Sequence, residues 1–87
     1  MSASMMSAAL RYTGLSPSER VIFASLWERA DSEGNCSPTI EALALDHEMS
    51  RRAVIKAIEI LATRDLVRVK HRGTGCLYHL QPMEDVL

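Results

Sequence analysis

Cysteine and aromatic residues are scarce in this 87-residue chain. Its two cysteines, Cys36 and Cys76, are too few for a disulfide scaffold, and neither a Cys-x-x-Cys pair nor a histidine stands at zinc-ligand spacing. We therefore expect two reduced thiols, as in a cytoplasmic protein. Aromatic residues make up 5% of the chain. That disfavours single-stranded RNA as a ligand, because its recognition needs bases stacked on exposed rings.

Long apolar runs are also absent. None approaches the roughly 20 residues needed to cross a membrane, and the N-terminus lacks the basic stretch and apolar block of a secretory signal. The chain has no Gly-rich phosphate loop, no nucleophile motif and no metal-ligand constellation, and a single domain this small is not expected to contain a cleft. We therefore expect no membrane contact, no cofactor, no small-molecule substrate and no enzymatic activity.

Net charge is low, at −1, but the charges are segregated along the chain. Residues 1–49 carry a net charge of −4, residues 50–72 carry +5, and the remainder carries −2. The basic segment contains Arg51, Arg52, Lys56, Arg64, Arg68, Lys70 and Arg72. Such a distribution gives the molecule a polar field that can orient it on a polyanion despite its near neutrality.

Three helices are predicted from capping residues and apolar spacing. The first begins after Ser16, with Pro17 at its first position and Glu19 completing a capping box, and ends near residue 31. A short extended piece at 36–38 precedes the second helix, which is capped by Ser37 or Thr39 and has an inward stripe of Ile40, Leu43 and Ala44. Ser50 caps the third helix, whose inward residues are Val54, Ala57, Ile58 and Leu61.

From Leu66 the apolar period changes to two. Residues 67–71 and 76–80 alternate around a glycine-containing turn at 72–75, which predicts a β-hairpin. The fold class is thus α+β, with three helices, a short strand and a C-terminal hairpin. We place the domain at residues 15–81, preceded at 1–14 by a tail or short helix, a tail being the commoner outcome, and followed at 82–87 by a tail.

The order of elements and several residue runs resemble the winged helix-turn-helix domains of bacterial and phage DNA-binding proteins. The resemblance is greatest to those of plasmid and phage replication proteins and small regulators. The runs that carry it are residues 15–19, 36–44, 49–58 and 65–69, within a match over roughly residues 15–81. This sequence departs from the family pattern at Asp65, where glycine is usual, and at Leu45 and Ile60, where polar residues are usual.

The resemblance implies that the helix after Ser50 enters the major groove of double-stranded DNA, while the hairpin, or wing, touches the flanking backbone or minor groove. It also implies that the short strand pairs with the last wing strand, which would bring Cys36 near residues 76–78. The residue pattern agrees on the helix: with its apolar stripe inward, its outward residues are Arg51, Arg52, Ile55, Lys56 and Glu59.

The candidate DNA-binding residues are Ser50, Arg51, Arg52, Ile55, Lys56, Arg68, Lys70, His71, Arg72 and Gly73. Among them, Arg51 or Arg52 suits guanine edges, Lys56 suits either a base or a phosphate, and Ser50, Lys70 and Arg72 suit phosphates. In the hairpin, Gly73 and Gly75 permit close backbone approach. A merely solvated basic helix face is the simpler alternative for the helix residues.

The sequence favours a small transcriptional regulator that occupies a DNA site, particularly if residues 1–87 are the whole protein. The origin-binding domain of a replication initiator and a winged helix used for protein–protein contact are the alternatives. We also expect a homodimer, because some apolar residues exceed what a three-helix core can bury. They are Met5, Met6, Leu10, Leu15, Val21, Trp27, Leu45, Ile60, Val86 and Leu87, and they place the contact on the N-terminal segment and the first helix. A monomer whose tails fold back over that helix is the alternative.

Overall fold

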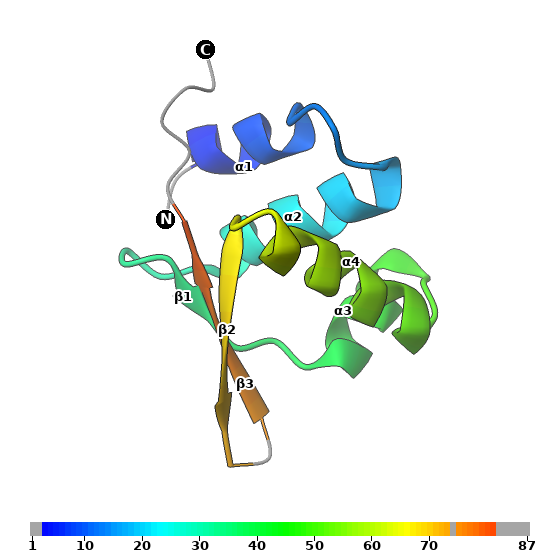
Figure 1. Cartoon of the computed structure of the whole chain (residues 1–87), viewed down its shortest axis with the longest axis vertical. Coiled ribbons are helices and arrows are strands. Elements are labelled where there is room, and N and C mark those ends of the chain that lie inside the picture. Colours follow the sequence, from blue (N-terminus) through cyan, green and yellow to red (C-terminus); the bar gives the residue numbers. More distant parts are fainter. Residues whose placement is uncertain (1–2, 74, 82–87) are drawn as a thin grey trace.

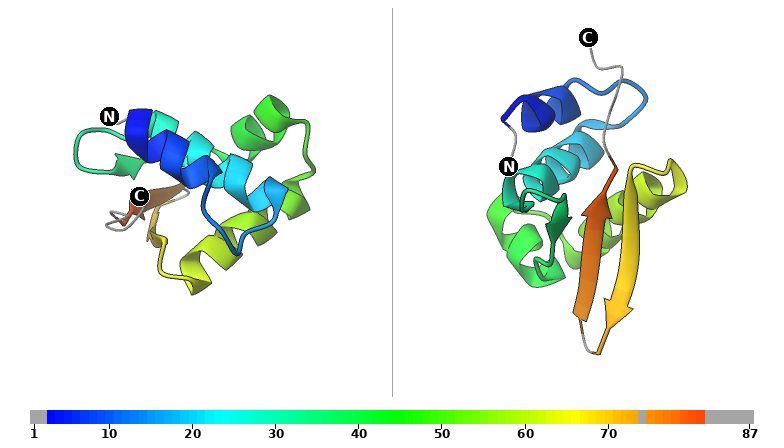
Figure 2. Two further views of the ribbon diagram at one scale, coloured as in Figure 1. Left: turned by 90° about the horizontal axis from the view of Figure 1, so that it is seen from above. Right: turned by 90° about the vertical axis from the view of Figure 1, so that its left-hand side faces the viewer.

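The computed structural model of the chain describes residues 3–73 and 75–81, except for the side chains at positions 3, 4, 6 and 72. Its elements are α1 (Ala3–Leu10), α2 (Pro17–Arg29), β1 (Asn35–Cys36), α3 (Ile40–His47), α4 (Arg51–Thr63), β2 (Val67–Arg72) and β3 (Gly75–Leu80). The helices gather at one side of a small sheet, and the hairpin of β2 and β3 projects beyond them (Figures 1 and 2). The predicted α+β winged-helix class is confirmed, with one helix more than the sequence predicted.

Helix starts follow the predicted capping residues. The Ser16 hydroxyl accepts a hydrogen bond from the Glu19 N–H at 3.3 Å, and the Glu19 carboxylate accepts one from the Ser16 N–H at 2.9 Å. Thr39, not Ser37, caps α3, its hydroxyl lying 3.0 Å from the Ala42 nitrogen. Ser50 caps α4 in the same way. Each cap satisfies a backbone N–H that the helix itself leaves free, and so fixes the first residue of the helix.

The core lies between α2, α4 and the sheet. Its largest fully buried side chains are Ile22, Phe23, Leu26, Leu43, Val54, Leu61, Val67 and Leu80. Arg29 near the end of α2 donates to the buried Ser25 hydroxyl and pairs with Asp46 of α3. The arginine therefore ties α2 to α3 and supplies a partner for the one buried polar side chain of the described core.

The N-terminal segment forms helix α1 rather than the tail that the sequence favoured. It lies along α2, with Ala8 and Ala9 buried against it (Figure 2). After α1, the Tyr12 ring meets Phe23 edge-on, with 6.0 Å between ring centroids. Alanine has the highest helix propensity, and its small side chain lets two helices approach closely, so packing stabilises a helix whose sequence has weak apolar periodicity.

Because α1 packs along α2, part of the predicted apolar interface patch is buried. Leu15 and Trp27 are buried in the monomer, as the alternative of a folded-back N-terminus requires. The exposed large apolar residues of the described chain are Leu10, Leu45 and Ile55, which lie on three different helices. Met6, Val86 and Leu87 of that patch, and the predicted tail at 82–87, fall outside the described side chains and residues. Among the described helices, none combines the length and the apolar character that crossing a membrane requires.

The sheet is antiparallel, in the order β1-β3-β2. Cys36 of β1 stands opposite Tyr78 of β3, so the predicted pairing of the short strand with the last wing strand is confirmed. The neighbouring pair adds a side-chain hydrogen bond between His79 Nδ1 and Asn35 Oδ1 at 2.8 Å. Gly34 precedes β1 with φ +86°, and a Cβ there would lie 3.1 Å from the Leu80 carbonyl oxygen. Glycine thus allows β1 to reach the sheet.

Candidate nucleic-acid interface

Helix α4 presents its basic residues on the side opposite its apolar stripe. Successive residues turn by about 100° around a helix, so burial of Val54, Ala57, Ile58 and Leu61 turns Arg52 and Lys56 outward. Both are exposed, and neither takes part in an ion pair within the described part of the chain. The first two turns of α4 therefore present two cations to solvent that have no ion-pair partner in the described chain.

A tight turn between α3 and α4 places the two helix ends side by side. Glu48 adopts the left-handed conformation with φ +53°, and the Met49 N–H donates to the Ala44 carbonyl at 2.9 Å. This geometry brings Arg51 to Glu41 of α3, with 3.1 Å between Nε and Oε2. Arg51 and Arg52 are adjacent in the sequence, but only Arg51 is tethered to the neighbouring helix.

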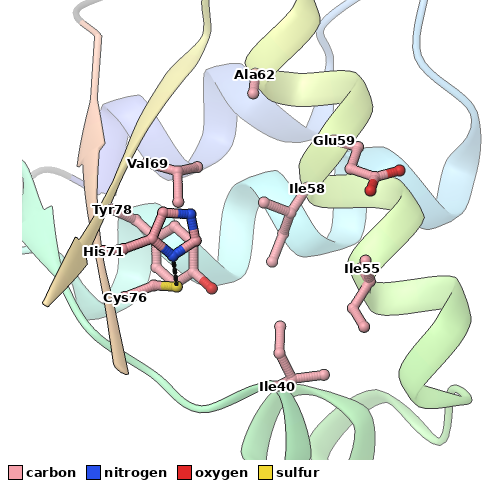
Figure 3. Close-up of a pocket in the computed structure, with 9 residues that line it drawn as sticks. All are labelled: Ile40, Ile55, Ile58, Glu59, Ala62, Val69, His71, Cys76 and Tyr78. Carbon is pink, nitrogen blue, oxygen red and sulfur yellow. Dashed lines mark hydrogen bonds between the residues drawn. The ribbon is translucent and has the colours of Figure 1, made fainter. Parts of the chain in front are cut away.

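The hairpin has two chemically different faces, because side chains alternate along a strand. Val69 and His71 of β2 face α4, where they line a cavity together with residues of that helix (Figure 3). Arg68 and Lys70 are exposed on the opposite face. The candidate wing residues therefore do not form one cluster: His71 points toward α4, whereas Arg68 and Lys70 point away from it.

At the tip of the hairpin, Arg72 and Gly75 form the last pair of the register. Gly73 has φ +53° and would leave space around an added Cβ, so its conformation rather than crowding favours glycine. The Arg72 side chain lies outside the described part of the structure. Gly73 is exposed, so the backbone is accessible at the tip of the hairpin.

A cavity of about 360 Å³ separates α4 from the hairpin. Figure 3 shows Ile55 and Ile58 reaching it from α4, and His71 and Cys76 from the sheet. A second hollow, of about 320 Å³, continues from it past the start of α4, where Arg51 and Glu41 line it. Ile55, predicted to face DNA, lies at the cavity edge with 39% of its surface exposed. Its side chain borders both the helix surface and the space beneath the wing.

One contact in the cavity was missed by the sequence analysis. The Cys76 sulfur lies 3.4 Å from His71 Nδ1, across the paired strands. Burial, followed by the neighbouring Cys76 and a hydrogen bond to it, raises the pKa of the Tyr78 hydroxyl to about 12. The signal was present in the sequence, because a hairpin centred on 73–74 places 71 opposite 76, but His71 was interpreted only as a source of charge.

Within the described residues, no group of three or more histidine, cysteine, aspartate or glutamate side chains comes together in a way that could hold a metal ion. Acidic residues are instead used locally. Asp31 accepts hydrogen bonds from the N–H groups of Asn35 and Glu33, at 3.0 and 2.8 Å, and these bonds lower the pKa of its carboxyl group. The carboxylate thereby shapes the turn that leads into β1.

Comparison with known families gives a match over the centre of the chain. A family described as a helix-turn-helix domain matches residues 13–67, which is more than half of the sequence. The matched segment contains α2, α3 and α4 and ends at the first residue of β2. No curated protein is similar enough to the chain to count as a match.

Proposed function

Because the chain belongs to the helix-turn-helix domain family, we propose that it binds a specific site on double-stranded DNA. In this proposal α4 lies in the major groove and the β2–β3 hairpin lies against the flanking backbone. The observation that carries it is the N-terminal half of α4, which exposes Arg52 and Lys56 with no ion pair in the described chain. Exposed cations without an ion-pair partner can bind phosphates, and an arginine or lysine can also donate hydrogen bonds to base edges.

The residues of α4 receive different roles. The Arg52 guanidinium is assigned to guanine, whose O6 and N7 it can contact together. Lys56, one turn further, is assigned to a base edge or a phosphate, and Ile55 to a thymine methyl group. The Ser50 hydroxyl accepts a bond from the Ala53 N–H, but its own proton is free to be donated to a phosphate. Arg51 is assigned to a phosphate, since its contact with Glu41 holds the guanidinium beside α3 and makes it less free to reach a base edge.

The hairpin is assigned a positioning role. Arg68 and Lys70 are exposed on one face of β2, and such a pair suits consecutive phosphates rather than bases; Arg72, at the end of the same strand, is assigned to a phosphate from the sequence alone. Gly73 allows the tip to approach the backbone closely. His71 faces the cavity instead, so it is not assigned a phosphate. Sequence specificity would then come from α4 and general affinity from the wing.

Double-stranded DNA is favoured over single strands by the placement of the rings. The four aromatic side chains are Tyr12, Phe23, Trp27 and Tyr78, and each is buried or half-buried. Single-strand recognition relies on bases stacked on exposed rings, whereas duplex recognition relies on cations and hydrogen-bond donors. The described surface offers cations and hydrogen-bond donors, as duplex recognition requires.

As a biological role we propose transcriptional regulation in the cytoplasm by occupation of a site, with origin binding in replication as the alternative use of the same surface. Two copies on a palindrome would double the base contacts. The contact that we inferred from the sequence, on the N-terminal segment and α2, has less apolar surface than expected because Leu15 and Trp27 are buried in the monomer, while Leu10 remains exposed. The homodimer is proposed mainly on the symmetry argument.

Selection from a random library of duplexes, followed by fluorescence anisotropy on the selected site, tests DNA binding. Replacing Arg52 or Lys56 by alanine is expected to weaken binding to that site about tenfold or more. Arg11→Ala is the matched control, because Arg11 is exposed directly after α1, outside the elements assigned to DNA. If no duplex is enriched, the proposal is wrong, and the apolar cavity beside Ile55 would favour protein–protein contact instead.

A further inference from the structure

The two cysteines have opposite environments. Cys36 is buried in β1, and burial raises the pKa of its thiol to about 11. Cys76 is half-buried and lines both hollows between α4 and the hairpin. A thiolate, not a thiol, is the nucleophile in sulfur chemistry, so reactivity follows ionisation and access. On both grounds, Cys36 is expected to be inert, which leaves Cys76 as the thiol that reagents can reach.

Cys76 also has a base beside it. Antiparallel pairing fixes His71 opposite Cys76, and Nδ1 lies 3.4 Å from the sulfur (Figure 3). With its proton on Nε2, the imidazole accepts the thiol hydrogen at Nδ1. Tyr78 lies next to Cys76 on the same sheet face, and its hydroxyl remains protonated at neutral pH, so it can donate a hydrogen bond to sulfur. One group can therefore remove the proton while the other stabilises the anion.

We propose that Cys76 is a thiol-modification site for low-molecular-weight disulfides, and that an adduct on it prevents α4 and the hairpin from docking together on DNA. The first part rests on the Cys76–His71 pair in its open cavity. The second part rests on the proposed DNA-binding function. It also rests on the position of Cys76, which belongs to the hairpin and lines the cavity between the hairpin and α4.

The reaction is a thiol–disulfide exchange. His71 Nδ1 takes the Cys76 proton, and the sulfur attacks one sulfur of the disulfide R–S–S–R. A bond forms between Cys76 and that sulfur while the original S–S bond breaks. The departing thiolate takes the proton from His71 and leaves as R–SH. No external oxidant is needed, because the incoming disulfide is itself reduced, and excess thiol reverses the step.

The effect of the adduct depends on its size and charge. The cavity of about 360 Å³ has room for a small neutral group such as S-methyl. A glutathionyl group is larger and carries net negative charge, so it would extend from the cavity past Ile55 and Arg51 toward the DNA-facing surface. A negative group there opposes a polyanion and occupies the space between helix and wing. Glutathionylation is therefore inhibitory, whereas S-methylation is tolerated.

Reactivity is measured first, on the folded full chain with oxidised glutathione, by intact mass and peptide mapping. We expect one adduct, on Cys76, with Cys36→Ser reacting like the native chain and Cys76→Ser at least about tenfold more slowly. His71→Gln should slow modification of Cys76 about tenfold, because the base is lost while a polar side chain remains. Thermal unfolding of each variant shows whether it is folded. Equal labelling of both cysteines, or a rate indifferent to His71→Gln in a folded variant, would overturn the site.

Binding is measured second, on Cys36→Ser protein bearing either glutathionyl or S-methyl at position 76. The expected result is a rise of about tenfold or more in Kd with glutathionyl, less than about twofold with S-methyl, and full recovery with excess thiol. Equal Kd values for modified and unmodified protein would overturn the switch and leave the proposed DNA binding intact. If the unmodified protein binds no duplex, the proposed function fails and with it the switch, while the reactivity measurement still decides whether Cys76 is the modification site.

Discussion

Arg51 and Arg52 are adjacent in the sequence, yet their surroundings in the structure differ. The helix turns by about 100° between them, which leaves Arg51 within reach of Glu41 and directs Arg52 into solvent. The sequence indicated that one of the two arginines contacts bases but left the choice open, because Glu41 belongs to another helix. The difference between them is therefore a tertiary one: Glu41 of α3 contacts Arg51 across the turn that contains Glu48.

We therefore expect the two arginines to give different results when replaced. Arg52→Ala should cost about 1–3 kcal/mol of binding free energy on the preferred site and relax the preference at one base pair. Arg51→Ala should weaken binding to all sequences to a similar, smaller extent. Anisotropy titrations against the preferred duplex and its single-base variants measure both effects. A specificity change with Arg51→Ala and none with Arg52→Ala would reverse the assignment.

Asp31 gives a prediction on acid stability. Hydrogen bonds from the backbone lower the pKa of its carboxyl group in the folded state below the ordinary value of 3.8. The carboxylate thus stabilises the fold above that value, and the contribution is lost as the pH falls through the folded pKa. Asp31→Asn should lower the free energy of unfolding at neutral pH, with the difference from the native chain vanishing in strong acid. Urea unfolding at a series of pH values tests this, and a difference independent of pH would contradict it.

At the scale of elements, the hairpin shows how far the pattern in the sequence reaches. Period-two alternation and the glycines predicted both strands to within one residue, although Arg72 and Gly75, assigned to the turn, belong to the strands. Alternation also implies that Arg68 and Lys70 share one face and His71 the other, but which face meets α4 is decided by burial of Val67, a tertiary contact. From the sequence, these residues were predicted to share one wing surface, but His71 lines the cavity and Arg68 and Lys70 lie on the other face.

The face of β2 that bears Arg68 and Lys70 leads to a prediction on salt dependence. Lys70→Ala should weaken binding equally on all duplex sequences and reduce the dependence of log K on log salt by about one unit, because one phosphate contact is lost. Titrations between low and moderate salt measure the slope. Arg11→Ala removes the same charge outside the elements assigned to DNA and should leave the slope unchanged. An unchanged slope for Lys70→Ala would remove the wing face from the interface.

Helix α1 was the element that sequence reasoning described least well. Residues 16–19 carry a capping box, so the start of α2 could be predicted, whereas residues 1–9 have no charge and only weak periodicity. Its helix depends on contact with α2, through Ala8 and Ala9, and such contact has no local signature. Of the apolar residues assigned to an interface, Leu15 and Trp27 are buried in the fold, whereas Leu10 and Leu45 remain exposed.

For the molecule as a whole, α1 is expected to contribute to the stability of the entire fold. Ala9 is fully buried against the core, so Ala9→Leu should overpack the α1–α2 contact and lower the free energy of unfolding by about 1–3 kcal/mol. Ser7→Leu on the exposed side of the same helix is the control and should have little effect. Chemical unfolding of both variants measures the difference. Equal stabilities would mean that α1 packs more loosely than its burial indicates.

The same shape sets a gradient of backbone opening along the hairpin. β1 contributes only Asn35 and Cys36, which pair with His79 and Tyr78 of β3. The sheet therefore has three strands near the helices and only two toward Arg72 and Gly75. Amide hydrogens near the tip should exchange with solvent deuterium faster than those near Val67 and Leu80, which open only with the core. Duplex DNA bound along the wing would slow amide exchange at the tip and leave exchange near Val67 and Leu80 unchanged. The wing would then act as a clamp that becomes rigid only when it is occupied.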